Sequence, residues 1–172
     1  MSPVARKPSG PSALAVSPGL FCKPLACGLT HTVALMSDGR ILAWGLSGFS
    51  QAHLPDLPRD AAGVPLARHR QVSAGPAHTM CVLSDGSIQD WGHNYRVPGF
   101  HTPPGPNVNF VRVGAGDGFN VALRTNGTLL AWGNGIGGRT TVPQLPPGVT
   151  YVDFAVSNAH TVALRSDGQA VH

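Results

Sequence analysis

A thirteen-residue pattern occurs four times in this chain of 172 residues and constrains the fold more than any other feature. The four copies begin at Gly28, Gly75, Gly116 and Ser157. Their turn residues are separated by 47, 41 and 41 positions, and they are Asp38, Asp85, Asn126 and Asp167. A period of this length is typical of an array of small structural units, none of which can bury its apolar residues alone. The sequence therefore predicts a repeat protein.

Each copy contains a turn signal between two apolar segments. In the first copy, residues 32–36 and 41–44 flank the sequence Ser37-Asp38-Gly39-Arg40. An Asp-Gly or Asn-Gly pair in this setting favours a β-hairpin with a type I′ turn, because that turn needs positive φ at both central residues. The four pairs are Asp38-Gly39, Asp85-Gly86, Asn126-Gly127 and Asp167-Gly168.

Further extended segments flank each hairpin. Residues 109–113 and 150–154 alternate in polarity as half-buried strands do, and residues 70–73 are a weaker example. Downstream, residues 140–143 end in Pro143, which a strand tolerates at a sheet edge. Each unit is thus predicted to contain three strands and a fourth, proline-bearing outer strand. The consecutive apolar residues 33–35 and 121–123 indicate a strand covered on both faces, as in radially stacked blades.

The predicted fold class is all-β, a partial β-propeller of three full units and part of a fourth. The 22 glycines, 16 prolines and absence of glutamate agree with it, because the chain is rich in turn formers and lacks a good helix former. Trp-Gly follows the first three hairpins, at Trp44-Gly45, Trp91-Gly92 and Trp132-Gly133, and the register places the next Trp-Gly directly after His172. The sequence predicts a disordered lead-in at 1–19 and an array over 20–172, with units near 20–66, 67–107, 108–148 and 149–172.

The pattern Ala-Gly-x-x-His-Thr-Val-Ala-Leu-x-Ser-Asp-Gly-x-x-x-Ala-Trp-Gly resembles the RCC1 (regulator of chromosome condensation) repeat. The link Thr-Val-Pro-x-Leu-Pro-Pro-Gly-Val at 141–149 is similar to the bacterial-type repeats of the β-lactamase inhibitor protein II group. In that family seven repeats usually close a propeller, so four cannot. The resemblance implies either a fragment or open ends capped by a partner or a second copy, with poor solubility of the chain alone.

Members of this family act through protein contacts, so the resemblance implies an interaction module, an inhibitor or an exchange factor for a small GTPase. Three departures stand out. Asp90 replaces the alanine of the other copies, Phe119 occupies the histidine slot, and the first link is about six residues longer around residues 59–66. No hairpin insert of the kind that exchange-factor members use against a GTPase is recognisable.

The repeated histidines, turn residues and tryptophans are predicted to be structural. His31, His78 and His160 occupy one slot in different units, so they cannot form one catalytic or metal centre; each is expected to hydrogen-bond backbone and hold its own blade together. With few carboxylates and no nucleophile elbow or phosphate loop, the chain is predicted not to be an enzyme, with no catalytic residues, no metal and no cofactor.

Candidate binding residues lie where the repeat gives no structural reason for them, directly after Trp-Gly. Propeller faces present loops from every blade, and aromatic and arginine side chains dominate binding hot spots. The candidates, with Tyr95 foremost, are Phe49, His93, Tyr95, Arg96, Asn134 and Ile136. The alternative is that these residues fold back onto their own blades.

The cysteines, the net charge and the apolar segments argue against several classes of protein. Cys27 and Cys81 stand in slots held elsewhere by alanine, so both are predicted to be buried thiols, and Cys22 with Cys27 lacks a second pair for zinc. A net charge of +4 without a basic, aromatic-rich stripe argues against nucleic acid and favours acidic protein surfaces. No signal peptide or membrane span is recognisable, which slightly favours the cytoplasm.

Three functional hypotheses remain open. The first is a non-catalytic module that binds a protein partner through loops of one propeller face. The second is regulation of a small GTPase by nucleotide exchange, and the third is a truncated product without independent function. Neither a small-molecule substrate nor a membrane is expected, and self-association through open blade ends is possible for an uncapped array.

Overall fold

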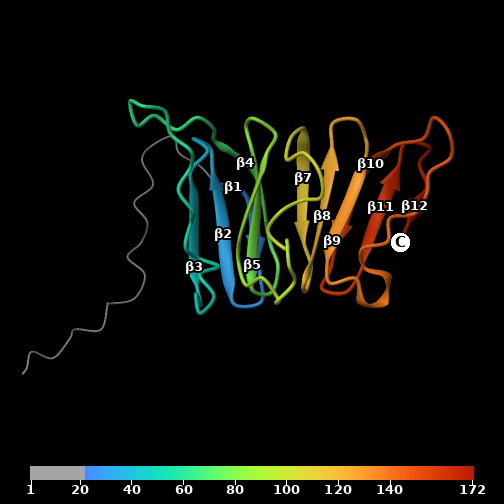
Figure 1. The fold of residues 1–172 in the computed structure, drawn as a ribbon, viewed down its shortest axis with the longest axis horizontal. Coiled ribbons are helices and arrows are strands. Elements are labelled where there is room, and N and C mark those ends of the chain that lie inside the picture. The colour runs from blue at the N-terminus through green and yellow to red at the C-terminus, as the bar shows by residue number, and fades with distance from the viewer. Residues whose placement is uncertain (1–21) are drawn as a thin grey trace, which may run out of the picture.

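The computed structural model describes residues 22–172 and shows an all-β chain (Figure 1). The predicted lead-in at 1–19 lies outside the described residues. Four three-stranded antiparallel sheets follow one another in chain order, each ordered as its strands occur in the sequence. Their strands are β1 Cys22–Cys27, β2 His31–Met36 and β3 Ile41–Gly45; β4 His69–Ala74, β5 His78–Leu83 and β6 Ile88–Gly92; β7 Phe110–Ala115, β8 Phe119–Arg124 and β9 Leu129–Gly133; β10 Tyr151–Val156, β11 Thr161–Arg165 and β12 Ala170–Val171.

The sheets form a partial β-propeller, as predicted. Successive sheets pack face to face over three apolar clusters, each shared by two neighbouring units. A short 3₁₀ helix, η1 Ile136–Gly138, follows β9. Within residues 22–172 the structure contains no helix of the length and apolarity that crossing a membrane requires.

The four predicted hairpins are present, but their turns differ from the predicted type. Gly39 has φ 85°, whereas Asp38 has no positive φ, so the loop is not type I′. It is a three-residue loop in which Gly39 N donates to Met36 O, and Met36 N donates to Arg40 O, at 2.9 and 2.8 Å. The aspartate serves another purpose, because its Oδ1 accepts a hydrogen bond from Arg40 N at 3.0 Å. Asp85, Asn126 and Asp167 accept the equivalent bond in their own loops.

Burial of the middle strands confirms the prediction of covered faces. Every residue of β5 is buried, and so are five of the six residues of β8. In β11 burial alternates instead, with Ala163 buried and Val162 and Leu164 about two-fifths exposed. One face of this last sheet packs on the third sheet, and its other face is open among the described residues.

The predicted fourth strand is absent from all four described units. Residues 140–149 form an irregular link after the third sheet, because its three prolines cannot donate hydrogen bonds to a sheet. The link nevertheless packs: Val142 and Leu145 contact the third apolar cluster, and the Tyr151 hydroxyl donates to Pro143 O at 2.7 Å.

The first strands of the four sheets line a central hollow, and this position corrects one cysteine prediction. The cavity includes residues of β1, β4, β7 and β10. Cys27 is exposed because it lies beside this hollow at the end of β1 rather than between two sheets. Cys81, between the first and second sheets, is buried as predicted, and burial raises the pKa of its thiol to about 12.

Candidate functional site

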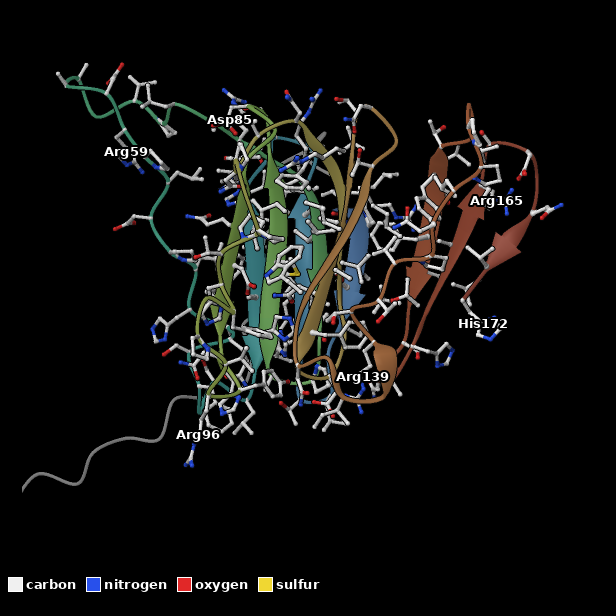
Figure 2. The ribbon with its side chains drawn as sticks, turned by 45° about the vertical axis from the view of Figure 1, so that its right-hand side comes forward. Arg59, Asp85, Arg96, Arg139, Arg165 and His172 are labelled. Carbon is white, nitrogen blue, oxygen red and sulfur yellow. The ribbon has the colours of Figure 1, made fainter. Side chains whose placement is uncertain are left out.

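The two ends of the hairpins form opposite rims of the molecule. The Asp-Gly turns lie on one rim, where Figure 2 labels Asp85. The strand register places the histidine slot opposite Gly45, Gly92 and Gly133 at the other end. The loops that follow Trp-Gly therefore share the second rim, where Figure 2 labels Arg96 and Arg139. The six candidate binding residues all belong to these loops.

Three of the candidates form one aromatic cluster across two loops. The ring of Phe49 packs edge-on against His93 with centroids 4.4 Å apart, and His93 packs against Tyr95 at 4.6 Å. We call Phe49, His93 and Tyr95 the rim cluster. Phe49 remains 53% exposed, so an apolar surface built from residues 44 positions apart is open to solvent on this rim.

Tyr95 connects the rim cluster to the buried framework. Its ring packs near Phe100 and His78, at centroid distances of 5.3 and 5.7 Å. Burial raises the pKa of the Tyr95 phenol to about 12, and the Asp117 carboxylate acts in the same direction. The hydroxyl oxygen is buried and makes no well-directed hydrogen bond to the described residues.

Arg96, unlike Tyr95, has a side chain that is exposed to solvent. Tyr95 and Arg96 have φ of 50° and 56°, an unfavourable left-handed conformation for two successive residues with side chains. Asn94 Oδ1 accepts a hydrogen bond from Arg96 N at 3.0 Å and helps to hold this turn. The Arg96 side chain points away from the sheets into solvent (Figure 2).

The remaining candidates lie in the third loop. Asn134 Oδ1 accepts a hydrogen bond from Ile136 N at 3.0 Å, and the Ile136 side chain is 69% exposed. The ring of Tyr95 and the side chain of Asn134 both lie over Gly118, which brings the second and third loops together. The structure thus joins Phe49, His93 and Tyr95 directly and places the other three candidates on the same rim.

Below the rim, His31 and His78 each join their own unit to the next. His31 Nε2 lies 2.8 Å from Thr79 Oγ1, and Thr79 Oγ1 donates to Gln51 O at 2.9 Å. Trp91 Nε1 donates to the same carbonyl at 3.0 Å. The prediction that the repeat histidines bond backbone within their own blades is wrong for His31 and His78, because each ring reaches a side chain of the following sheet.

The second junction repeats this arrangement with asparagine in place of threonine. His78 Nε2 lies 2.8 Å from Asn120 Oδ1, and Asn120 Nδ2 donates to Phe100 O at 2.9 Å. Trp132 Nε1 donates to Phe100 O at 2.9 Å. Burial lowers the pKa of His78 to about 4, so the ring is neutral and its Nε2–H donates to Asn120. We call these two sets of bonds the junction networks.

A buried carboxylate extends the second junction network. Asn120 Nδ2 also lies 3.1 Å from Asp90 Oδ2, and Asp90 Oδ1 lies 3.0 Å from His101 Nδ1. The Asp90 side chain is fully buried, and the contact with His101 is electrostatic rather than a well-directed hydrogen bond. Sequence reasoning missed this set, although Asp90 in an alanine slot was its visible signal.

Replacing Asp90 with asparagine is expected to change how stability depends on pH. Burial raises the pKa of the Asp90 carboxyl from 3.8 to about 6. The stability that this group contributes is present below pH 3.8 and is lost as pH rises through about 6. The variant lacks that loss, so its unfolding free energy should rise relative to the natural chain by roughly 2–3 kcal/mol from about pH 3.5 to 7. Urea unfolding at both pH values measures the difference, and a difference independent of pH would contradict the prediction.

The third junction lacks the network. Phe119 replaces the histidine and is fully buried, and it offers no hydrogen bond to the next unit. Thr161 Oγ1, in the slot of Thr79 and Asn120, is accordingly buried without a hydrogen-bond partner among the described residues. In the fourth unit His160 is exposed, and its Nδ1 lies 2.9 Å from Ser157 Oγ.

The repeat itself matches a known family. Residues 25–51 and 110–138 match the model of the regulator of chromosome condensation (RCC1) repeat, over β2 with β3 and over β7 to β9. These two segments are similar to the RCC1 repeat. Comparison with curated protein sequences gives no match.

Solved structures share the fold of this chain at low sequence identity. Human WBSCR16 has a TM-score of 0.67 and 19% identity, over 87% of this chain and 46% of that one. Prp20p of Saccharomyces cerevisiae has a TM-score of 0.64 and 18% identity, over 87% and 43%. The receptor kinase CR4 ectodomain of Physcomitrella patens has 0.65 and 20%, over 90% and 41%. The chain thus spans less than half of each of these proteins.

Proposed function

We propose that this protein is a non-catalytic interaction module that binds a protein partner through the rim carrying the Trp-Gly loops. The observation that carries the proposal is the rim cluster. The loops of two successive repeat units bring Phe49, His93 and Tyr95 into contact beside the exposed Arg96. Aromatic and arginine side chains around a partly exposed apolar centre have the composition of a binding hot spot.

The backbone at this rim supports the same proposal. The third loop after Trp-Gly also turns through two left-handed residues, Gly137 and Gly138, but in the second loop the two successive left-handed residues, Tyr95 and Arg96, carry side chains. Backbone strain of this kind is concentrated at functional sites, where the surrounding structure maintains it. Proteins that share this fold support a role in protein contacts: one report describes Prp20p binding to Gsp1p and histones, and another shows Kap60 bound to Prp20.

Substitutions on opposite rims test this proposal, and the two arginine substitutions remove the same charge. Arg96→Ala and Phe49→Ala are expected to weaken binding to a captured partner by about tenfold or more, because both side chains lie at the centre of the proposed surface. Arg59→Ala is the control, since Arg59 is exposed at the Asp-Gly rim (Figure 2). The partner is captured with the natural chain, and its affinity for each variant is measured with purified proteins. Equal affinity for the Arg96 and Arg59 variants would rule out this rim.

A second candidate function is regulation of a small GTPase by nucleotide exchange. The fold shared with Prp20p, whose report describes binding to Gsp1p, favours this candidate. It is tested by the release of labelled GDP from a panel of small GTPases. Accelerated release would support exchange activity, and unchanged release across the panel would leave the interaction module as the better account. The likeness of the 141–149 link to bacterial-type repeats supports neither candidate specifically.

Self-association is a further proposal about partners. Val162 and Leu164 are 40% and 41% exposed on the open face of the last sheet. A second copy could cover this face, and sedimentation at several protein concentrations measures whether it does. A chain that stays monomeric at high concentration would exclude this mode of assembly.

A further inference from the structure

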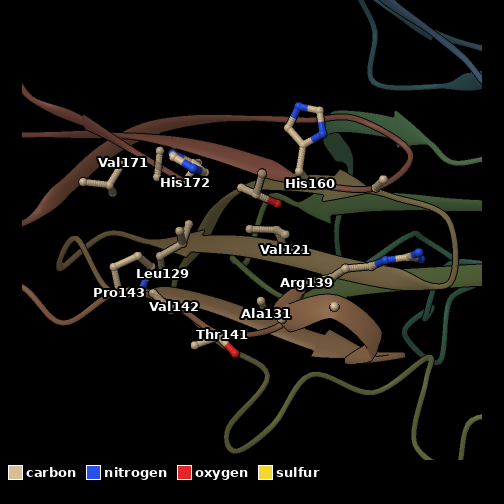
Figure 3. Close-up of a pocket in the computed structure, with 15 residues that line it drawn as sticks. Val121, Leu129, Ala131, Arg139, Thr141, Val142, Pro143, His160, Val171 and His172 are labelled. Carbon is tan, nitrogen blue, oxygen red and sulfur yellow. The ribbon is translucent and has the colours of Figure 1, made fainter.

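The second unit departs from the repeat pattern at Asp90, and the structure gives this residue a charged partner. Asp90, on β6, occupies the slot that holds Ala43 in the first unit and Ala131 in the third. Figure 3 shows Ala131 lining a cavity together with the aliphatic side chain of Leu129, so the slot itself requires no polar group. In the second unit His101, from the loop that follows β6, lies against the Asp90 carboxylate instead.

Asp90 and His101 form an ion pair that is largely removed from water. Asp90 Oδ1 lies 3.0 Å from His101 Nδ1, and the exposed fractions of the two side chains are 0% and 32%. The contact is not a well-directed hydrogen bond, so its attraction comes mainly from the two charges. A buried carboxylate without a partner is costly, which favours the geometry that keeps His101 beside it. We call these two residues the anchor pair.

Phe100 connects the anchor pair to the turn that carries Tyr95 and Arg96. Its ring is 1% exposed, and its centroid lies 5.2 Å from that of His101 and 5.3 Å from that of Tyr95. Its carbonyl accepts a hydrogen bond from Asn120 Nδ2 of the third sheet at 2.9 Å. The loop is therefore held to the third sheet through the Phe100 carbonyl and to its own sheet through His101. The position of the Tyr95 ring depends on both attachments.

The first loop after Trp-Gly has the carbonyl attachment without the charged one. Gln51 O accepts the equivalent hydrogen bonds from the second sheet, and the next residue is the uncharged Ala52. This loop contains one left-handed residue with a side chain, Ser50, whereas the second loop contains Tyr95 and Arg96 in succession. Strained turns persist only where the surrounding contacts maintain them, and the anchor pair supplies such a contact to the second loop.

The two members of the anchor pair titrate close to neutral pH. Burial raises the pKa of the Asp90 carboxyl to about 6. The contact with Asp90 raises the pKa of the His101 ring above its ordinary 6.5. Both groups are charged between these two pKa values; Asp90 becomes neutral below this range, and His101 becomes neutral above it. The attraction between them is therefore strongest near neutral pH and weaker on either side.

The other titratable groups near the pair do not change charge in this range. From β5, burial lowers the pKa of His78 to about 4 and raises the pKa of the Cys81 thiol to about 12. Burial likewise raises the pKa of the Tyr95 phenol to about 12. Two further groups lie beside Tyr95: the His93 ring, at a centroid distance of 4.6 Å, and the Asp117 carboxylate, which helps to raise the pKa of the phenol. His93 therefore needs its own control in any pH experiment.

We propose that the anchor pair positions the turn at Tyr95 and Arg96, and that gain or loss of a proton by either member of the pair loosens this turn. Asp90 and His101 are thus positioning residues that act on the rim through Phe100. The consequence for binding rests on the proposed function, since it requires the partner to contact this turn. The movement of the turn itself is measured on the chain alone.

The test is fluorine NMR of the chain labelled with 3-fluorotyrosine, which reports on its two tyrosines, Tyr95 and Tyr151. The difference between the chemical shifts in H2O and D2O measures the exposure of each ring, which a change of electric field alone would not alter. We expect the Tyr95 ring to be least exposed near neutral pH and more exposed below about pH 5 and above about pH 8. Tyr151, whose hydroxyl donates to Pro143 O, is the internal control and should not change.

Two conservative variants each remove one member of the anchor pair. His101→Gln and Asp90→Asn should both leave the Tyr95 ring more exposed at neutral pH and abolish its dependence on pH. The double variant should match the single variants, because the two residues act as a unit. His160→Gln removes an exposed histidine of the fourth unit and should leave the Tyr95 signal unchanged. Circular dichroism shows whether each variant is folded.

The pH series is repeated with His93→Gln, which keeps an acceptor for the Tyr95 N–H. A pH response that disappears in this variant, or one that survives in both His101→Gln and Asp90→Asn, would overturn the inference. Near neutral pH, His101→Gln should also bind the captured partner at least about fivefold more weakly than the natural chain. If the Tyr95 ring responds as expected but Arg96→Ala binds the partner normally, the positioning role stands and the proposed function fails.

Discussion

Replacing Asn120 with alanine should lower the free energy of unfolding by about 3–4 kcal/mol, because it leaves the buried Asp90 carboxylate with one fewer partner. Asn120 is fully buried and bonds His78, Asp90 and Phe100 O. Removing it deprives the His78 Nε2–H of its acceptor as well. Guanidinium unfolding followed by circular dichroism measures the loss.

The chain supplies a matched control for this prediction. Thr79 occupies the same slot in the previous unit, where it bonds both a histidine and a loop carbonyl. Asn120→Thr should therefore keep the bonds to His78 and the Phe100 carbonyl but lose the one to Asp90, and it should cost about 2 kcal/mol. Asn120→Ala should also cost less in an Asp90→Ala background, because no unpaired carboxylate remains. Equal costs for the alanine and threonine variants would show that the network contributes little.

Replacing Gly75 with alanine should lower the free energy of unfolding by roughly 2–3 kcal/mol, the usual cost of overpacking a filled interior. A Cβ at this position would lie 2.6 Å from His78 Cε1 and 2.8 Å from Gly116 O. The first atom belongs to the second junction network and the second is backbone, so neither can move freely. The glycine is needed for space, since its φ is not positive.

Gly48→Ala is the control for Gly75→Ala. A Cβ at Gly48 would meet nothing within 4 Å, so this variant should be as stable as the natural chain. The fourth unit carries Ser157 at the position equivalent to Gly75, where His160 is exposed and bonds the serine hydroxyl. If both alanine variants unfold at the same denaturant concentration, the close contact of glycine and ring is not a constraint.

The repeat pattern predicts the hairpins and the covered faces well because both are local consequences of residue spacing. Asp38 and Gly39 specify a turn, but the same pair suits two loop types, and the prediction selected the wrong one. Pro143 suggested an outer strand, whereas the link at residues 140–149 packs against the third apolar cluster without joining a sheet. Cys27 was expected to be buried by analogy with alanine, but its position beside the central hollow depends on how whole sheets are placed.

The sequence singled out the loops that carry the candidate residues, but it did not predict how these residues pack. Loops after Trp-Gly stood out because the repeat does not explain Phe49 or Arg96, and the structure places them on one rim. The contact between Phe49 and His93 depends on the geometry between two units, which no single repeat encodes. The junction network of His78, Asn120 and the Phe100 carbonyl was missed for the same reason, since its members come from different units.

Hydrogen exchange measured by mass spectrometry on the chain with and without its captured partner tests the central claim most directly. The account predicts slower exchange in the loops at residues 46–53, 93–101 and 134–138, with unchanged exchange in the Asp-Gly turns near Asp38, Asp85 and Asn126. Protection confined to the Asp-Gly turns, or spread equally over both rims, would contradict binding through the rim that carries the Trp-Gly loops.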